Sequence, residues 1–205
     1  FGPGLIEPVI DWTIVTQSLV FRDFRLARTC LRGVNELLPG VVLDLGDRGV
    51  STRCAWSPWA FADPEARITD PATAISTLRE VATATLGAWG ACFERPLIEI
   101  SGGLDSSIVA AGMRTEQSGV HCLTFGPAPG DPSELPWARA VAEHLGYPLT
   151  ELVADATTVD IRHSDARDLP RPCARAFSQA LDRPIQALAA GLHTDAFFGG
   201  GGGDS

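Results

Sequence analysis

The sequence predicts an α/β fold in which helices cover both faces of a parallel sheet. Short, almost continuously apolar segments alternate with segments of helical periodicity, which is the pattern of strands buried between two helical layers. The apolar run 97–100 leads into a Ser/Gly-rich segment and then into an apolar helical run, which places that segment at a strand's carboxyl end. The 205 residues, 45% of them hydrophobic, suffice for a sizeable core.

Each element of this fold follows from its local pattern. A helix is expected over 71–89, because apolar residues there recur every three or four positions. The remaining elements are expected, in chain order, as strand 97–100, helix 105–118, strand 120–126, helix 133–145, strand 148–153, helix 183–192 and strand 195–199.

The N-terminal third has a different pattern. Residues 8–38 carry apolar side chains at helical spacing, and Pro39-Gly40 ends this helical region. Two β-rich runs within 41–54 flank a Gly-containing turn and predict a hairpin. We therefore expect residues 1–59 to form a helical arm and a β-hairpin beside a main domain over 60–205.

Composition excludes several classes of function. A net charge of −9 argues against a general nucleic-acid or anionic-membrane surface. No apolar run is long enough to span a bilayer, and no signal-peptide pattern is present. The five cysteines are widely spaced without a CxxC pair, so buried, reduced thiols are expected rather than a zinc site. The sequence predicts a cytoplasmic protein that binds neither nucleic acid nor membrane.

Residues 101–107, SGGLDSS, are the most informative segment for chemistry. Gly102 and Gly103 have no Cβ, so the backbone can turn sharply and bring its N–H groups close to an anion. The helix that follows would point its unpaired N–H groups at the same place. Asp105 would repel a phosphate unless a divalent cation lay between them, which suggests magnesium. A simple turn with a helix cap is the alternative, but the whole run fits one anion-binding geometry.

SGGLDSS has neither the spacing nor the lysine of a Walker A loop. It resembles the pyrophosphate-binding loop (PP-loop) of ATP pyrophosphatases, and within them the asparagine synthetase family, which includes β-lactam synthetases and lasso-peptide macrocyclases. The resemblance implies an adenine nucleotide α-hydrolase-like domain. It extends to residues 28–59, which are similar to the segment that leads from the glutaminase domain into the synthetase domain. It thus implies that 1–59 is a remnant or linker of an upstream glutaminase-like domain and that 60–205 is the N-terminal part of the ATP-binding domain, incomplete at its C-terminus.

The resemblance also implies roles for individual residues. Asp105 and Ser106 are the expected catalytic residues, and Asp105 and Asp204 the expected magnesium ligands. The expected ATP contacts are Ser101, Gly102, Gly103, Asp105, Ser106, Ser107, Thr124, Phe125 and Gly200. For Thr124 and Phe125, a role as ordinary buried strand residues carries equal weight.

The C-terminal glycine run departs from the family pattern. Residues 199–205 match the Ser-Gly-Glu-Gly-Ser-Asp-Glu segment of asparagine synthetases with substitutions, and Asp204 falls on its aspartate. Gly201 replaces a glutamate that helps the ammonia step. A glycine run ending in aspartate looks more like the lasso-peptide cyclases, which adenylate a side-chain carboxylate of a precursor peptide.

The resemblance implies a carbon–nitrogen ligase that uses ATP and Mg2+ and releases AMP and pyrophosphate. A lasso-peptide macrolactam cyclase is preferred, with a precursor peptide as carboxylate substrate and a peptide-delivery protein as a potential partner. A glutamine-hydrolysing asparagine synthetase acting on aspartate, another PP-loop enzyme and a non-catalytic nucleotide-binding module remain open. All sixteen basic residues are arginines. The lysine that the family uses in amide formation is therefore expected outside these 205 residues.

Overall fold

The computed structural model describes residues 7, 9–21, 25–47, 49–113, 119–127, 133–163 and 178–201. These residues divide into two compact units. The first is built from Phe1–Ile68 with Ile161–Ala176, and the second from Thr69–Asp160 with Phe177–Ser205. Within the described residues, no helix combines the length and apolar character needed to cross a membrane.

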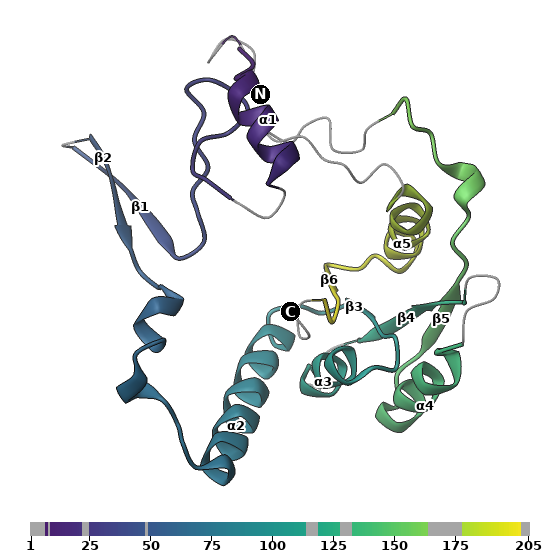
Figure 1. Ribbon diagram of the computed structural model, residues 1–205. Helices are drawn as coiled ribbons and strands as arrows, with labels where there is room; N and C mark the ends of the chain where they lie inside the picture. Colours follow the sequence, from purple (N-terminus) through teal and green to yellow (C-terminus); the bar gives the residue numbers. More distant parts are fainter. Residues whose placement is uncertain are drawn as a thin grey trace. The chain divides into compact units, whose positions relative to one another are not determined.

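The second unit is built on a four-stranded parallel sheet, so the predicted sheet type is confirmed. Its strands are β3 (Pro96–Glu99), β4 (His121–Phe125), β5 (Leu149–Leu152) and β6 (Ala196–Phe198), in the order β5-β4-β3-β6. Leu97 is paired with His121 on one side and with Phe197 on the other. The carboxyl ends of β3 and β6 are therefore neighbours, although about a hundred residues separate them along the chain (Figure 1).

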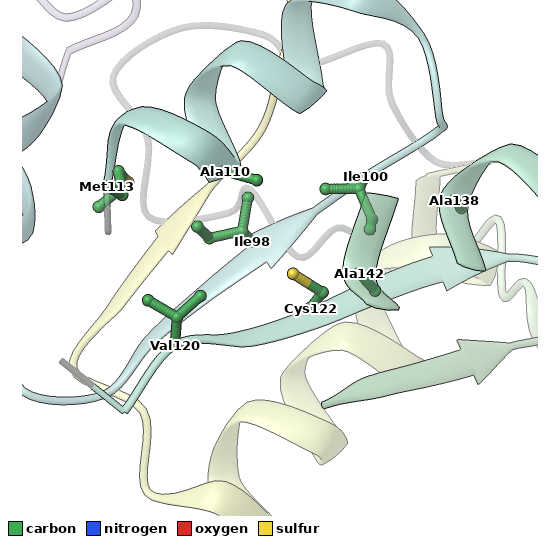
Figure 2. Packing of buried hydrophobic residues seen from close by; sticks show 8 residues of the cluster. All are labelled: Ile98, Ile100, Ala110, Met113, Val120, Cys122, Ala138 and Ala142. Atoms are coloured by element: carbon green, nitrogen blue, oxygen red, sulfur yellow. The ribbon is translucent and has the colours of Figure 1, made fainter. Parts of the chain in front are cut away.

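Helices cover both faces of this sheet (Figure 1). They are α2 (Pro71–Gly90), α3 (Leu104–Gly112), α4 (Leu135–Leu145) and α5 (Gln179–Leu192). The main core lies between the sheet and helices α3 and α4, with α5 on the opposite face (Figure 2). The buried cluster consists of Ile98, Ile100, Ala110, Met113, Val120, Cys122, Ala138 and Ala142.

Local sequence explains the limits of these helices. Asp70 caps α2 by accepting a hydrogen bond from the Thr73 N–H at 2.8 Å, and Pro71 fits the first helical position. Gly146 ends α4 in the left-handed conformation at φ +72°. The predicted end of the helix after the SGGLDSS loop, residues 114–118, lies outside the described residues.

Helix α5 begins four residues before the predicted start at 183. The buried side chain of Gln179 explains the difference, because it pairs with the backbone of Asp160 through its amide. The Asp160 N–H donates to Gln179 Oε1 at 2.9 Å, and Gln179 Nε2 donates to the Asp160 carbonyl at 3.3 Å. This anchor holds a helical turn ahead of Pro184, which the local pattern alone favours as a helix start.

The first unit contains α1 (Trp12–Val20) and a hairpin of β1 (Val41–Gly46) and β2 (Gly49–Cys54). Short 3-10 turns follow at Pro58–Phe61 and Pro64–Ala66.

The prediction of a helical region continuing to residue 38 is wrong for residues 25–38. There the chain forms turns, with isolated antiparallel bridges between Ile10 and Leu31 and between Arg28 and Asn35. Gly33 takes a positive φ of +76°, and the Thr29 hydroxyl donates to the Val34 carbonyl at 2.8 Å. These local bonds replace the helical ladder.

Burial of the cysteines is mixed. Cys30 and Cys122 are buried free thiols, and burial raises the pKa of Cys122 to about 12. Cys54 and Cys92 are free but exposed, so the expectation of buried thiols is wrong for these two. Cys173 lies outside the described residues.

Candidate functional site

The SGGLDSS segment forms the wall of a cavity of about 490 Å³ at the carboxyl ends of β3 and β6. β3 ends at Glu99, and α3 begins at Leu104, one residue before the predicted start. The lining residues come from the β3–α3 segment and from the segment after β6. They are Glu99, Ser101, Gly103, Leu104, Asp105, Ser106, Gly199, Gly200 and Gly201.

Gly102 takes a conformation that favours glycine, with φ +82°. A Cβ at this position would lie 2.4 Å from Trp137 Cβ and 2.7 Å from the Ala138 nitrogen. The start of α4 therefore presses against the loop and fixes its turn. Gly102 and Ser107 line a second cavity of about 290 Å³ against α4, not the cavity that holds Asp105.

Three serines brace the loop through their hydroxyls. The buried Ser106 Oγ accepts from the Ser101 N–H at 3.2 Å and lies 3.2 Å from Ser101 Oγ. Ser101 Oγ accepts from the Gly103 N–H at 3.2 Å, and Ser107 Oγ donates to the Gly103 carbonyl at 2.6 Å. These bonds close the loop on itself, so its shape exists without a ligand.

The first N–H groups of α3 belong to residues that line the cavity and have no backbone acceptor within the helix. The first backbone bond of the helix is donated by Ser107 to the Gly103 carbonyl at 3.3 Å. The N–H groups of Leu104, Asp105 and Ser106 therefore precede the helical ladder. Together with the helix dipole they favour an anion at this position.

The glycine run after β6 approaches the loop closely at one residue. A Cβ on Gly200 would lie 2.6 Å from the Ser106 nitrogen and 2.7 Å from its Cα. A Cβ on Gly201 would meet no atom of the described residues within 4 Å. Gly200 thus allows backbone contact with the first turn of α3, whereas Gly201 leaves open space. Asp204, the second predicted magnesium ligand, lies outside the described residues.

The two predicted adenine contacts lie one strand away. Thr124 is buried and Phe125 is half-buried at the end of β4. β4 joins the loop region through a hydrogen bond from the Ile100 N–H to the Leu123 carbonyl at 2.8 Å. Neither Thr124 nor Phe125 is among the described residues that line the 490 Å³ cavity.

Glu99 is a cavity residue that the sequence did not single out. Burial raises the pKa of its half-buried carboxyl group, and the nearby Asp182 carboxylate of α5 raises it further. The available signal was a lone acid inside the apolar run 97–100, directly before the loop.

The charged side chains in the described wall of the cavity are both acidic, Glu99 and Asp105. Asp105 with the hydroxyls of Ser101 and Ser106 offers hard oxygen donors of the kind that Mg2+ prefers. The described residues contain no group of three or more His, Cys, Asp or Glu side chains placed to hold a metal. Of the described carboxylates, Asp105 is thus the candidate that could bind a magnesium ion together with oxygens of a bound phosphate.

Comparison with known proteins agrees with this geometry. The family model of asparagine synthase matches residues 95–204, which include the loop, the sheet and the glycine run. No curated protein matches the chain. Because the match covers more than half of its residues, the chain belongs to the asparagine synthase family.

Proposed function

We propose that this protein is an ATP-dependent ligase that adenylates a carboxylate, releases pyrophosphate and transfers the acyl group to an amine. The asparagine synthase family to which it belongs consists of ATP-dependent, amide-forming ligases. The observation that carries the proposal is the cavity that the SGGLDSS loop shares with the glycine run, two segments that follow the paired strands β3 and β6.

Different groups of residues would bind different parts of ATP. The Gly103 backbone and the free N–H groups at the start of α3 would hold the pyrophosphate portion, with Ser101, Ser106 and Ser107 keeping the loop in shape. Thr124 and Phe125 would flank the adenine. Gly200, which has no side chain, would let the segment after β6 lie close to the nucleotide.

Asp105 and Asp204 would hold Mg2+. The metal would neutralise charge on the phosphate oxygens. Asp105 stands in the first turn of α3, where the helix dipole also favours its carboxylate.

The preferred substrate is a precursor peptide whose side-chain carboxylate is activated and whose N-terminal amine attacks. Gly201 supports this preference, because it leaves open space where asparagine synthetases carry a glutamate. A peptide acceptor needs more room than ammonia does. Such a ligase would work with a protein that delivers the peptide.

The test is a product assay with the full-length protein, ATP and Mg2+. Two carboxylates are supplied in parallel: aspartate with ammonium, and a synthetic peptide with a free N-terminus and an internal Asp or Glu. AMP and pyrophosphate with a dehydrated peptide would support the cyclase, and AMP with asparagine would support the alternative. Production of ADP, or no nucleotide cleavage with either carboxylate, would contradict the proposed function.

A further inference from the structure

Glu99 is a cavity side chain to which the adenylation chemistry gives no role. It ends β3, whose other residues, Pro96, Leu97 and Ile98, are buried. Its Oε2 atom lies 3.9 Å from the position that a Cβ on Gly199 would take. Because residue 199 is a glycine, it has no side chain that contacts this carboxylate on the side of the cavity formed by the segment after β6.

The surroundings of Glu99 are negative. Asp182, in the first turn of α5, is a second nearby carboxylate, and it accepts a hydrogen bond from Ser178 Oγ at 2.7 Å. Among the described residues, no arginine or histidine forms an ion pair with Glu99. A half-buried carboxylate that has no basic partner among the described residues is suited to pairing with a bound cation.

The proposed reaction brings two cations to the cavity, the magnesium ion that accompanies ATP and the amine in its ammonium form. Asp105 stands beside the free N–H groups of α3, where the phosphates would lie. Glu99 lies instead next to Gly199, and the described residues that line the cavity after β6, Gly199, Gly200 and Gly201, are all glycines. The two acids therefore fit different cations.

We propose that Glu99 is the specificity-determining residue that binds the acceptor amine as it enters in its ammonium form, before the amine loses a proton to water and attacks the acyl adenylate. The inference rests on the proposed ligase function and deepens it by naming the acceptor class. The acceptor is a primary amine that is cationic at neutral pH, as ammonia and a peptide N-terminus both are.

The experiment separates activation from amine use in the full-length protein. Isotopic exchange between ATP and pyrophosphate reports carboxylate activation. Amide formation from a peptide whose own N-terminus is acetylated, with ammonium added at varied concentration, gives the KM for the amine. Glu99→Gln is compared with wild type and with Glu80→Gln, the same chemical change at an exposed position on α2. We expect Glu99→Gln to raise the amine KM by about ten-fold or more, the value of a hydrogen bond to a charged group, beyond any change in exchange. Glu80→Gln should behave as wild type.

Hydroxylamine is an acceptor that is largely uncharged near neutral pH. If Glu99 had only a structural role, its substitution would change the KM for hydroxylamine and for the cationic amine alike. Glu99→Gln should lose the preference for the cationic amine over hydroxylamine. Glu99→Asp, which keeps the charge but shortens its reach, should raise the amine KM while leaving the hydroxylamine KM in place. If Glu99→Gln does not fold, the KM values of Glu99→Asp still test whether Glu99 binds the cationic amine.

Each contrary result has a distinct meaning. Absence of exchange in the wild type contradicts the proposed ligase function and the inference with it. Normal exchange with an unchanged amine KM in both Glu99 variants overturns the inference alone. So does a shift in the Mg2+ requirement without a shift in amine KM, since Glu99 would then serve the metal.

Discussion

At the scale of single residues, Glu99 places a cost on stability at neutral pH. Its pKa in the folded protein lies above the ordinary value of 4.5, chiefly through burial and further through Asp182. The folded state therefore takes up a proton before the unfolded state as pH falls, and it gains stability through that window. Above the window the ionised carboxylate disfavours the folded state.

Glu99→Gln should therefore raise the melting temperature at neutral pH. The advantage over wild type should shrink as pH falls through the raised pKa, and it should vanish below about 4.5, where both states are protonated. Thermal unfolding of both proteins across this range measures it, with Glu80→Gln as the control. A variant less stable than wild type at neutral pH would show that Glu99 serves the fold rather than a ligand.

Asp105, in contrast to Glu99, should matter little for the stability of the fold and much for activity. Asp105→Asn should change the free energy of unfolding by less than about 1 kcal/mol, since it alters only a favourable helix-dipole interaction in the first turn of α3. Loss of its charge at the phosphate position should lower AMP formation by about 100-fold or more. Denaturant unfolding measures the change in stability, and an AMP assay measures the loss of activity. Retention of full activity would remove Asp105 from the proposed metal site.

At the scale of elements, the contact between α3 and the segment after β6 holds the cavity together. Gly200→Ala would place a Cβ 2.6 Å from the Ser106 nitrogen, so the two backbones must separate. We expect a destabilisation of about 1–3 kcal/mol, as for other overpacked sites, together with loss of ATP–pyrophosphate exchange.

Gly201→Ala is the matched control, because its Cβ would meet no atom within 4 Å in the part of the chain that the structure describes. It should change stability by less than about 0.5 kcal/mol. Denaturant unfolding and exchange assays on both variants test the comparison. Equal behaviour of the two variants would show that the close approach at Gly200 is not needed for the site.

At the scale of the whole molecule, the site lies within one of the two compact units. A non-hydrolysable ATP analogue with Mg2+ should slow amide hydrogen exchange in β3, the start of α3 and β6. It should leave α1 and the β1–β2 hairpin as they were, because those elements belong to the other unit. Hydrogen-exchange mass spectrometry measures this pattern, and equal protection of α1 would contradict it.

Much of the second unit could be predicted, because its strands are marked by sequence patterns that lie within the strands and the turns beside them. The limits of strands β3, β4, β5 and β6 each fall within one residue of the predicted ones, since continuous apolar runs bounded by turns mark buried parallel strands. The start of α5 could not be predicted, because it depends on Gln179 meeting the backbone of Asp160.

The conformation of residues 25–38 and the place of Glu99 in the cavity also could not be predicted from local sequence patterns. The apolar spacing over 25–38 is compatible with a helix, but the Thr29 hydroxyl and the turn at Gly33 give the chain another conformation. Glu99 was missed because a strand covered on both faces shows no alternation, so a single acid within it does not reveal which side it faces. Roles assigned through the family resemblance, including that of Asp204, remain predictions.

The pairing of β3 with β6 has a consequence for biosynthesis. The Asp195 carboxylate accepts hydrogen bonds from the Glu94 and Arg95 N–H groups at 2.7 and 3.0 Å, which joins the two strands at their beginnings. A ribosome that has released the SGGLDSS loop must still translate about ninety residues before β6 emerges. Because contacts between residues far apart in the chain form slowly, we expect the nucleotide cavity to form late in folding. A nascent chain would thus be unable to capture ATP until its sheet is complete.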